Sequence, residues 1–335
     1  MPEGAPHSTG NTHDAAPHHA ASSSLAGHPA DPTPSPQAGF SQQLALHTAA
    51  MLFGASALFG EHIAASSTMI VFGRGLFSWL ALTVIALAGL AGLRSAARLS
   101  GGAPWQGIAP SSAVRLLIAG VLLAVHWLAF FLAIKEGGVA VGTLGFACFP
   151  AFVILLEWPL RRERPSLGDA GVIALVCIGL ALVTPQFDWQ ANATVGLAWG
   201  VLSGAIYAVI ALSNRVLGAQ ASPLQASWWQ CLAIVIVLAP FIGREALALP
   251  ASQWGWLACL GVVCTALAYT LFIHALRTVK ASQAAVVIAL EPVYAIAFAW
   301  VLFGTSPTLK MLVGGVCIVG AVAWSGWMRG RSGAH

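Results

Sequence analysis

Apolar stretches of about 20 residues, the length that a helix needs to cross the roughly 30 Å hydrocarbon core of a bilayer, follow one another from Leu44 almost to the end of the chain. Short polar breaks separate these stretches. The chain is 58% hydrophobic and 8% charged, whereas soluble domains are about 25% charged, which excludes a water-soluble protein. We predict an all-α integral membrane protein of about ten transmembrane helices, over residues 44–60, 69–93, 114–134, 139–160, 168–185, 195–215, 224–242, 254–276, 282–303 and 308–327.

The basic residues support this number of helices. With the N-terminus inside, eleven Lys and Arg residues fall in cytoplasmic segments, three fall on the other side, and Arg74 lies within the second helix. Because cytoplasmic loops collect Lys and Arg, we predict a multi-pass protein of the cell inner membrane with both termini in the cytoplasm. The net charge of +4 reflects this topology. Since the basic residues form no patch, we expect no nucleic-acid partner.

Residues 1–42 differ sharply in composition from the rest. They are rich in Pro, Ala, Ser and His and nearly free of large aliphatic residues, so we predict a disordered cytoplasmic tail. No basic segment precedes an early apolar core, and a cleavable signal peptide is therefore not expected. The tail histidines lack a regular ligand spacing, and the six cysteines lie in apolar runs without a CxxC pair. We expect neither a metal site nor a cofactor.

The chain contains an internal repeat. A shift of 142 residues aligns residues 133–167 with 275–309 without a gap, so that Pro150 meets Pro292 and Trp158 meets Trp300. Five predicted helices separate the copies. Because this number is odd, equivalent residues face opposite sides of the membrane, which is the inverted repeat found in many secondary transporters.

Short motifs recur in both copies. Ala-Ile-Lys at 133–135 precedes Phe149-Pro150 in the first copy, and Ala-Leu-Arg at 275–277 precedes Leu-Glu-Pro at 290–292 in the second. Together with Leu-Arg-Arg-Glu-Arg at 160–164, these motifs resemble the EamA-type family of the drug/metabolite transporter superfamily over residues 44–327. Arg74 matches the Arg that usually opens the second helix of that family. Thr305 stands where the family usually has Glu, and departs from the pattern.

The resemblance implies a fold and a function. It implies two five-helix repeats, which we place at residues 43–186 and 194–328, around a central cavity, and export or exchange of small metabolites such as amino acids. The expected partners are a small solute and the lipid bilayer. Because no GxxxxGK[ST] loop is present to hold a nucleotide, we expect a secondary transporter that works by alternating access, with protons as a candidate coupling ion, and not an enzyme.

The paired prolines point to the centre of the membrane. Pro150 and Pro292 each remove a helical hydrogen bond, and interruptions at matching positions in two repeats indicate a central site. The alternative is a packing kink.

Glu291 is the only acid near the middle of a predicted helix. A carboxylate at that depth is unfavourable unless it has a function, so Glu291 is a candidate for binding a substrate amine or a coupling proton. A structural hydrogen bond to a neighbouring helix is the alternative. Its counterpart in the first copy is Phe149, which breaks the symmetry at this position.

Arg74 is a candidate to pair with a substrate carboxylate or with Glu291, or else to extend toward the outer interface. The other polar and aromatic candidates for the cavity wall lie on helices that flank the proline segments, where ordinary packing is the alternative for each. They are His126, Trp127, Gln230, Tyr269 and His274.

Three glycines, Gly196, Gly200 and Gly204, repeat every four residues on the sixth predicted helix. This pattern predicts close helix packing, with the seam of a homodimer as the alternative.

Two other function classes remain open on the sequence alone. An intramembrane enzyme with Ser56 as nucleophile would need a paired base, for which no second motif is visible. A membrane scaffold or sensor that transports nothing would need neither Glu291 nor the paired prolines.

Overall fold

The computed structural model describes residues 36–96, 103–161, 166–183, 191–217, 221–276, 287–288 and 290–332, and this part of the chain contains helices and no strand. Its helices are α1 (Pro36–His62), α2 (Ser67–Leu90), α4 (Pro110–Phe146), α5 (Phe149–Arg161), α6 (Leu167–Val183), α7 (Asn192–Leu217), α8 (Pro223–Ile242), α9 (Glu245–Ala248), α10 (Ala251–Gly261), the π-helical turn η1 (Val262–Leu267), α11 (Ala268–Leu276), α13 (Glu291–Phe303) and α14 (Leu309–Ser332).

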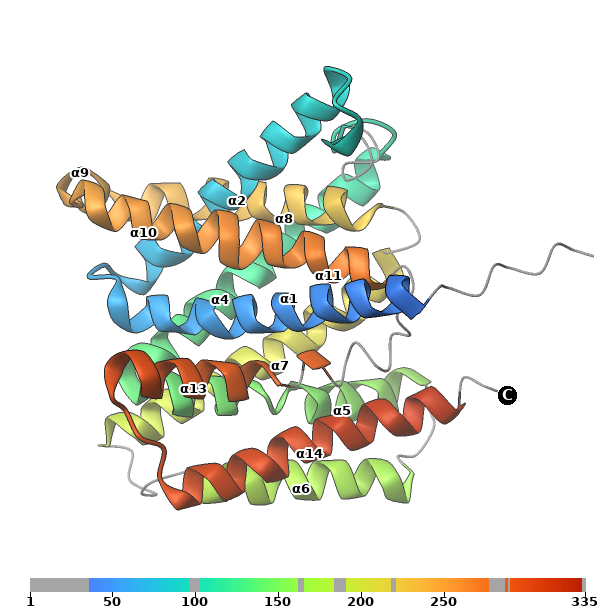
Figure 1. The fold of residues 1–335 in the computed structure, drawn as a ribbon, viewed down its shortest axis with the longest axis vertical. Helices are drawn as coiled ribbons and strands as arrows, with labels where there is room; N and C mark the ends of the chain where they lie inside the picture. The colour runs from blue at the N-terminus through green and yellow to red at the C-terminus, as the bar shows by residue number, and fades with distance from the viewer. Residues whose placement is uncertain are drawn as a thin grey trace, which may run out of the picture. The chain divides into compact units, whose positions relative to one another are not determined.

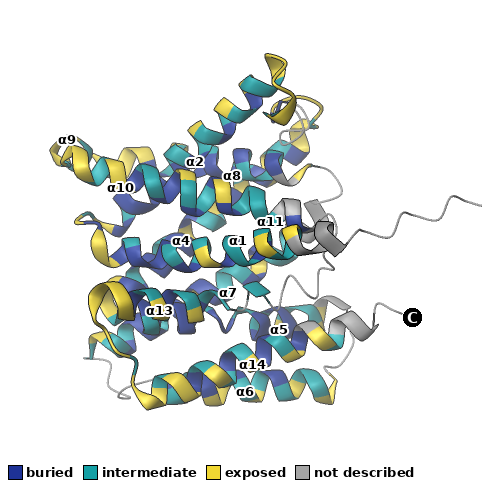
Figure 2. Ribbon diagram, in the orientation of Figure 1, coloured by how far each residue is buried: buried dark blue, intermediate teal, exposed yellow. Residues whose placement is uncertain are grey.

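Six helical segments of the described chain are long and apolar enough to cross a membrane. They are Ser41–His62, Ser67–Leu90, Pro110–Phe146, Asn192–Ser213, Leu224–Ile242 and Ala251–Phe272. Four further apolar helices are shorter, namely Phe149–Pro159, Leu167–Val183, Glu291–Phe303 and Leu309–Ser325. Large apolar side chains such as Val301 and Val316 are exposed on these helices (Figure 2), as expected where the solvent is lipid.

The helices of residues 36–332 pack side by side. In Figure 1, α1 and α4 run through the middle, α2, α8 and α10 lie on one side of them, and α7, α13 and α5 lie on the other. The pair α6 and α14 packs at the edge beyond α5.

The first helix starts earlier than predicted. α1 begins at Pro36, before the predicted tail boundary at residue 42, because the polar turns that precede the apolar stretch continue the same helix. Residues 1–35 of the predicted tail lie outside the described residues.

The break between the third and fourth predicted helices is shorter than the sequence suggests. The predicted break over residues 135–138 is reduced to Gly138, whose φ of 78° interrupts α4 and which, having no Cβ, tolerates this conformation. The Val139 N–H donates to the Glu61 Oε1 at 3.1 Å, which satisfies a donor at the start of the segment that follows the kink.

Both proline segments coincide with helix ends. The predicted helix 139–160 breaks between Phe146 and Phe149, and Pro150 lies in the first turn of α5. Pro292 likewise lies in the first turn of α13, after Glu291. Proline is favoured there because the first turn lacks N–H partners in any case. Each proline therefore follows an interruption and lies in a first turn, where it removes no helical hydrogen bond, in contrast to the prediction.

The predicted close packing of the glycine face of α7 is confirmed. A Cβ at Gly196 would lie 2.5 Å from the Cα of Gly137, and one at Gly200 would lie 3.0 Å from the carbonyl oxygen of Gly142. α4 thus covers this face within the same chain, which rules out the alternative that these glycines form a dimer seam.

The chain turns at one end of the bundle are joined by polar contacts. Glu245 accepts hydrogen bonds from the Ser66 N–H and Oγ at 2.6 and 2.7 Å, and the Ala64 N–H donates to the Gln253 Oε1 at 3.1 Å. Beneath these turns lies a dense apolar cluster that includes Ile63, Met69, Phe131 and Leu257. This end of the bundle is closed.

Candidate functional site

A cavity of about 200 Å³ lies inside the bundle, between α1, α2, α4, α7, α8, the segment from η1 to α11, and α13. The distance of the cavity from the start of α2 follows from the residue numbers along that helix. The lining side chains Arg74, Ser78 and Leu82 are seven to fifteen residues from the start of α2 at Ser67, or about 10 to 22 Å at 1.5 Å per residue. The cavity is thus displaced from the closed end, where the apolar cluster fills the space.

The structure brings together six of the seven predicted side chains. Around the cavity stand Arg74, His126, Trp127, Gln230, Tyr269 and Glu291. The seventh, His274, belongs to α11, and its side chain lies outside those that the structure describes. Pro150 and Pro292 are buried near the cavity segments but do not themselves line it.

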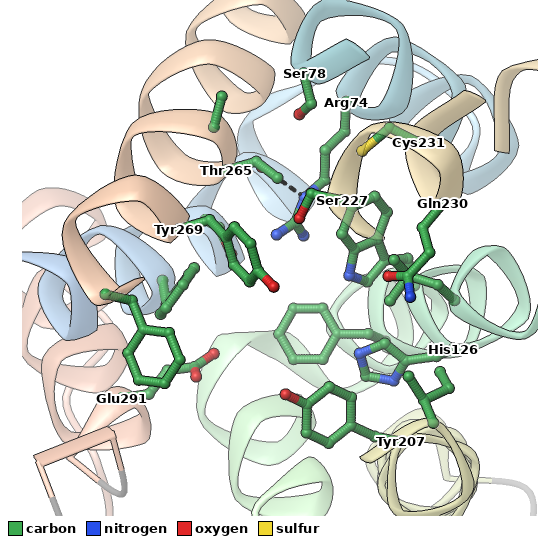
Figure 3. A pocket seen from close by; sticks show the side chains of 18 of the residues that line it. Arg74, Ser78, His126, Tyr207, Ser227, Gln230, Cys231, Thr265, Tyr269 and Glu291 are labelled. Carbon is green, nitrogen blue, oxygen red and sulfur yellow. Dashed lines mark hydrogen bonds between the residues drawn. The ribbon is translucent and has the colours of Figure 1, made fainter. Parts of the chain in front are cut away.

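Arg74 is buried on α2 and held from two sides. Its guanidinium carbon lies 3.9 Å from the ring centroid of Trp127, a cation–π contact, and its Nε donates to the Thr265 Oγ1 at 2.9 Å. Figure 3 shows the two terminal nitrogens of Arg74 directed into the cavity. The guanidinium therefore presents donors to an anion at a fixed place.

Glu291 lies on another wall, in the first turn of α13. Gly54 of α1 makes room for this turn, since a Cβ there would lie 2.8 Å from the Glu291 carbonyl oxygen. The N-terminus of a helix favours a negative charge, which suits a carboxylate at this position. Among the described residues, no salt bridge within 4.0 Å joins Glu291 to Arg74, and the space between the two side chains belongs to the cavity (Figure 3).

Part of the cavity wall is aromatic. The ring of Tyr207 lies 5.0 Å from that of His126 and 5.4 Å from that of Phe146, and Phe146 also lies 5.3 Å from His126. Figure 3 shows the hydroxyls of Tyr207 and Tyr269 directed toward the cavity. Such a wall suits a ligand with an apolar or aromatic part.

His126 is anchored to α7. Its Nδ1 lies 3.0 Å from the Ser203 carbonyl oxygen and 2.8 Å from the Ser203 Oγ, and the Ser203 Oγ donates to the His126 carbonyl at 3.2 Å. These bonds fix the ring against the wall. Ser56 also lines the cavity, but within the described chain the hydrogen bonds of His126 go to Ser203 and not to Ser56, so the structure shows no activated serine there.

Sequence reasoning missed several lining residues, among them Tyr207, Ser227 and Thr265. Thr265 is the nearest partner of Arg74, yet a single threonine in an apolar helix carries no pattern. Tyr207 could have been found, because it lies three residues beyond Gly204 on the helix that the glycine repeat packs against α4.

The arrangement combines a cation, an acid and aromatic rings around one cavity. It can hold a small molecule that carries a carboxylate at one end, an amine at the other and an apolar group between them.

Comparison with known proteins places this cavity in context. The EamA-like transporter family matches residues 41–184 and again residues 194–327. An uncharacterized transporter from Archaeoglobus fulgidus is 25% identical over 287 residues, which cover 84% of this chain and 96% of that protein. The pseudopaline exporter CntI from Pseudomonas aeruginosa is 24% identical over 206 residues, covering 61% of this chain and 72% of the exporter.

The uncharacterized transporter YwfM from Bacillus subtilis is 30% identical over 189 residues, which cover 54% of this chain and 62% of that protein. A solved crystal structure superposes with a TM-score of 0.57 at 20% identity and covers 87% of this chain and 98% of its own. It shows that the fold is shared.

Proposed function

The chain belongs to the EamA-like transporter family, and we propose that it is a secondary transporter that exports a small zwitterionic metabolite, such as an amino acid, across the inner membrane. The observation that carries this proposal is the cavity with Arg74, Glu291 and aromatic side chains on its wall. A multi-pass membrane protein whose relatives are named as transporters has its natural solute site in such a cavity.

The charged groups define how such a solute would lie. A planar guanidinium held by Trp127 and Thr265 offers two parallel N–H donors to a carboxylate. Glu291 accepts the ammonium group, or a proton when the solute is absent. The rings of His126, Tyr207 and Phe146 contact the apolar part.

We further propose the topology in which residues 43–186 and 194–328 form two inverted five-helix repeats, with both termini and the tail in the cytoplasm. The two separate matches to the family, at 41–184 and 194–327, support two repeats. The helix interruptions before Pro150 and near Pro292 occur at equivalent places of the proposed repeats.

In this topology the closed end faces outward. The bonds of Glu245 to Ser66 and of Glu61 to Val139 hold the outer turns together, and the apolar cluster beneath them separates the cavity from that side. Alternating access then requires these contacts to open while the opposite end of the bundle closes.

The experiment is transport in liposomes. Purified protein is reconstituted and offered a panel of labelled amino acids, each with its decarboxylated amine as a control, with and without an imposed pH gradient. We expect saturable flux of amino acids, and we expect the matching amines to inhibit this flux only weakly. Absence of flux for every solute, by protein shown to be folded, would favour a scaffold or sensor and refute the proposal.

A further inference from the structure

Arg74 has a long flexible side chain, so its terminal nitrogens face the cavity only because other groups hold it. The Trp127 ring supports one face of the guanidinium at 3.9 Å. A ring contact leaves rotation in the plane of the guanidinium free. A directional bond is needed to fix that rotation, and the Nε bond to the Thr265 Oγ1 at 2.9 Å supplies it.

The direction of this bond is set by a second bond of the same hydroxyl. The Thr265 Oγ1 donates its single hydrogen to the Leu260 carbonyl at 2.9 Å. Its lone pairs are then available to the Nε–H of Arg74. Thr265 thus binds Arg74 through the Nε–H, and leaves the paired N–H groups of the two terminal nitrogens free for an anion.

The π-helical turn places Thr265 there. The sequence predicts one continuous helix over residues 254–276, but η1 interrupts it at Val262–Leu267, where the Ala268 N–H bonds to the Val263 carbonyl five residues back. Such turns occur often at functional sites. Here the Thr265 hydroxyl reaches five residues back as well, to Leu260.

The turn is also fixed to α2. The Ser78 Oγ donates to the Gly261 carbonyl at 2.9 Å, one turn of α2 beyond Arg74. Gly261 permits this approach, because a Cβ there would lie 2.7 Å from the Cβ of Phe77 and 2.8 Å from the Arg74 carbonyl oxygen. The turn that carries Thr265 and the helix that carries Arg74 therefore keep one relative position.

We propose that Thr265 is a positioning residue for the carboxylate site at Arg74, and that the π-helical turn exists to present its hydroxyl to the Arg74 Nε. The inference rests on the proposed function in one respect, that Arg74 receives the carboxylate of the solute. Without the Thr265 hydroxyl, the guanidinium must be ordered by the anion itself, and binding is weakened by the entropy of that ordering.

The test measures anion binding at Arg74 directly, with acetate as the probe. Full-length protein in detergent is treated with p-hydroxyphenylglyoxal, which modifies the terminal nitrogens of arginine, and modification of Arg74 is followed by mass spectrometry against acetate concentration. Chloride at equal ionic strength is the salt control, and the exposed Arg94 is the internal reference that acetate should not protect.

Three variants separate positioning from general damage. Thr265→Val removes the hydroxyl at nearly constant shape, and Thr265→Ser restores it. Thr270→Val is the matched control, because the Thr270 Oγ1 also donates to a backbone carbonyl, that of Ala266 at 2.7 Å, but does not line the cavity.

We expect the acetate concentration that gives half protection to rise about five- to tenfold in Thr265→Val, the loss typical of the net contribution of one hydrogen bond. It should stay within about twofold of wild type in Thr265→Ser and Thr270→Val. Equal protection in Thr265→Val and wild type overturns the inference, as does an equal loss in Thr270→Val. Failure of acetate to protect Arg74 in the wild type overturns it too.

Transport is measured separately on the same preparations. If acetate protection follows the expected order while liposomes show no flux, the transport proposal fails and the role of Thr265 stands. If Thr265→Val shows the same flux and the same acetate protection of Arg74 as wild type, the proposed role of Thr265 fails and the transport proposal stands.

Discussion

Replacing Glu291 by Gln is expected to uncouple transport from the pH gradient without disturbing the fold. The carboxylate lies in the first turn of α13 and faces the cavity. Its backbone packs on Gly54, where no side chain intervenes. An amide has nearly the same size and still forms hydrogen bonds, but it cannot bind and release a proton, so the variant tests the proton and not the shape.

The size of the effect follows from coupling. One proton moving down a gradient of one pH unit supplies about 1.4 kcal/mol, which corresponds to about tenfold accumulation of a solute exchanged one for one. The cavity holds one acid among the residues that line it, so one proton for each solute is the expected ratio. In Glu291→Gln the accumulation driven by one pH unit should fall from about tenfold to none. Exchange of labelled for unlabelled solute should continue at a higher KM, because the amide oxygen still accepts from the ammonium group of the solute but carries no charge.

The assay supplies labelled solute outside matched liposomes, with and without a pH step, and measures its accumulation. Counterflow is measured in the same preparations after the liposomes are loaded with unlabelled solute. Glu136→Gln is the control, because Glu136 is an exposed acid outside the cavity, and we expect it to behave as wild type. Wild-type accumulation by Glu291→Gln would refute the assignment of the coupling proton. Loss of exchange together with accumulation would refute the expectation that the amide still holds the ammonium group of the solute.

Three further outcomes are expected. Arg74→Lys keeps the charge but loses the two parallel donors and the Nε bond. The KM of a transported amino acid should therefore rise about tenfold or more, while inhibition by the matching amine changes little. Equal changes for the amino acid and the amine would refute the carboxylate contact. Gly196→Ala places a Cβ 2.5 Å from the Cα of Gly137 and should lower the stability of the fold by about 1–3 kcal/mol, measured as a lower Tm. The control Gly255→Ala places a Cβ with no atom within 4 Å and should leave the Tm unchanged. Cross-linking Ser66→Cys to Glu245→Cys with a short reducible thiol reagent should lower flux at least about tenfold by holding the closed end shut, and a reductant should restore it; unchanged flux in cross-linked protein would show that this end need not open.

Much of the architecture could be predicted because lipid simplifies the rules. Long apolar stretches identify helices wherever the backbone must satisfy its own hydrogen bonds, and the glycine face of α7 showed where two helices touch. Six cavity residues were found for the same reason, since polar groups such as Arg74 and Glu291 stand out in an apolar chain. The irregular parts were found less well. The paired prolines indicated an interruption near Pro150, but not that the break after Phe146 precedes the proline. No local pattern in the sequence carries the π-helical turn at Val262–Leu267.

The difference between the two halves of the sequence acquires a physical meaning in the cavity. Phe149 is the counterpart of Glu291 in the aligned repeats, and its ring stacks on Phe146 at 5.6 Å and contacts Tyr207 at 5.3 Å. Phe149 does not itself line the cavity, but it packs on Phe146 and Tyr207, which do, so the first copy supports an aromatic wall where the second contributes an acid. A symmetric pair of acids would repel each other and would bind a dication, whereas one acid opposite an arginine and beside aromatic rings favours a solute that is charged at both ends and apolar between them. In the proposed transporter, the same asymmetry leaves a single site for a coupling proton, so substitution of Glu291 alone should abolish the response to pH.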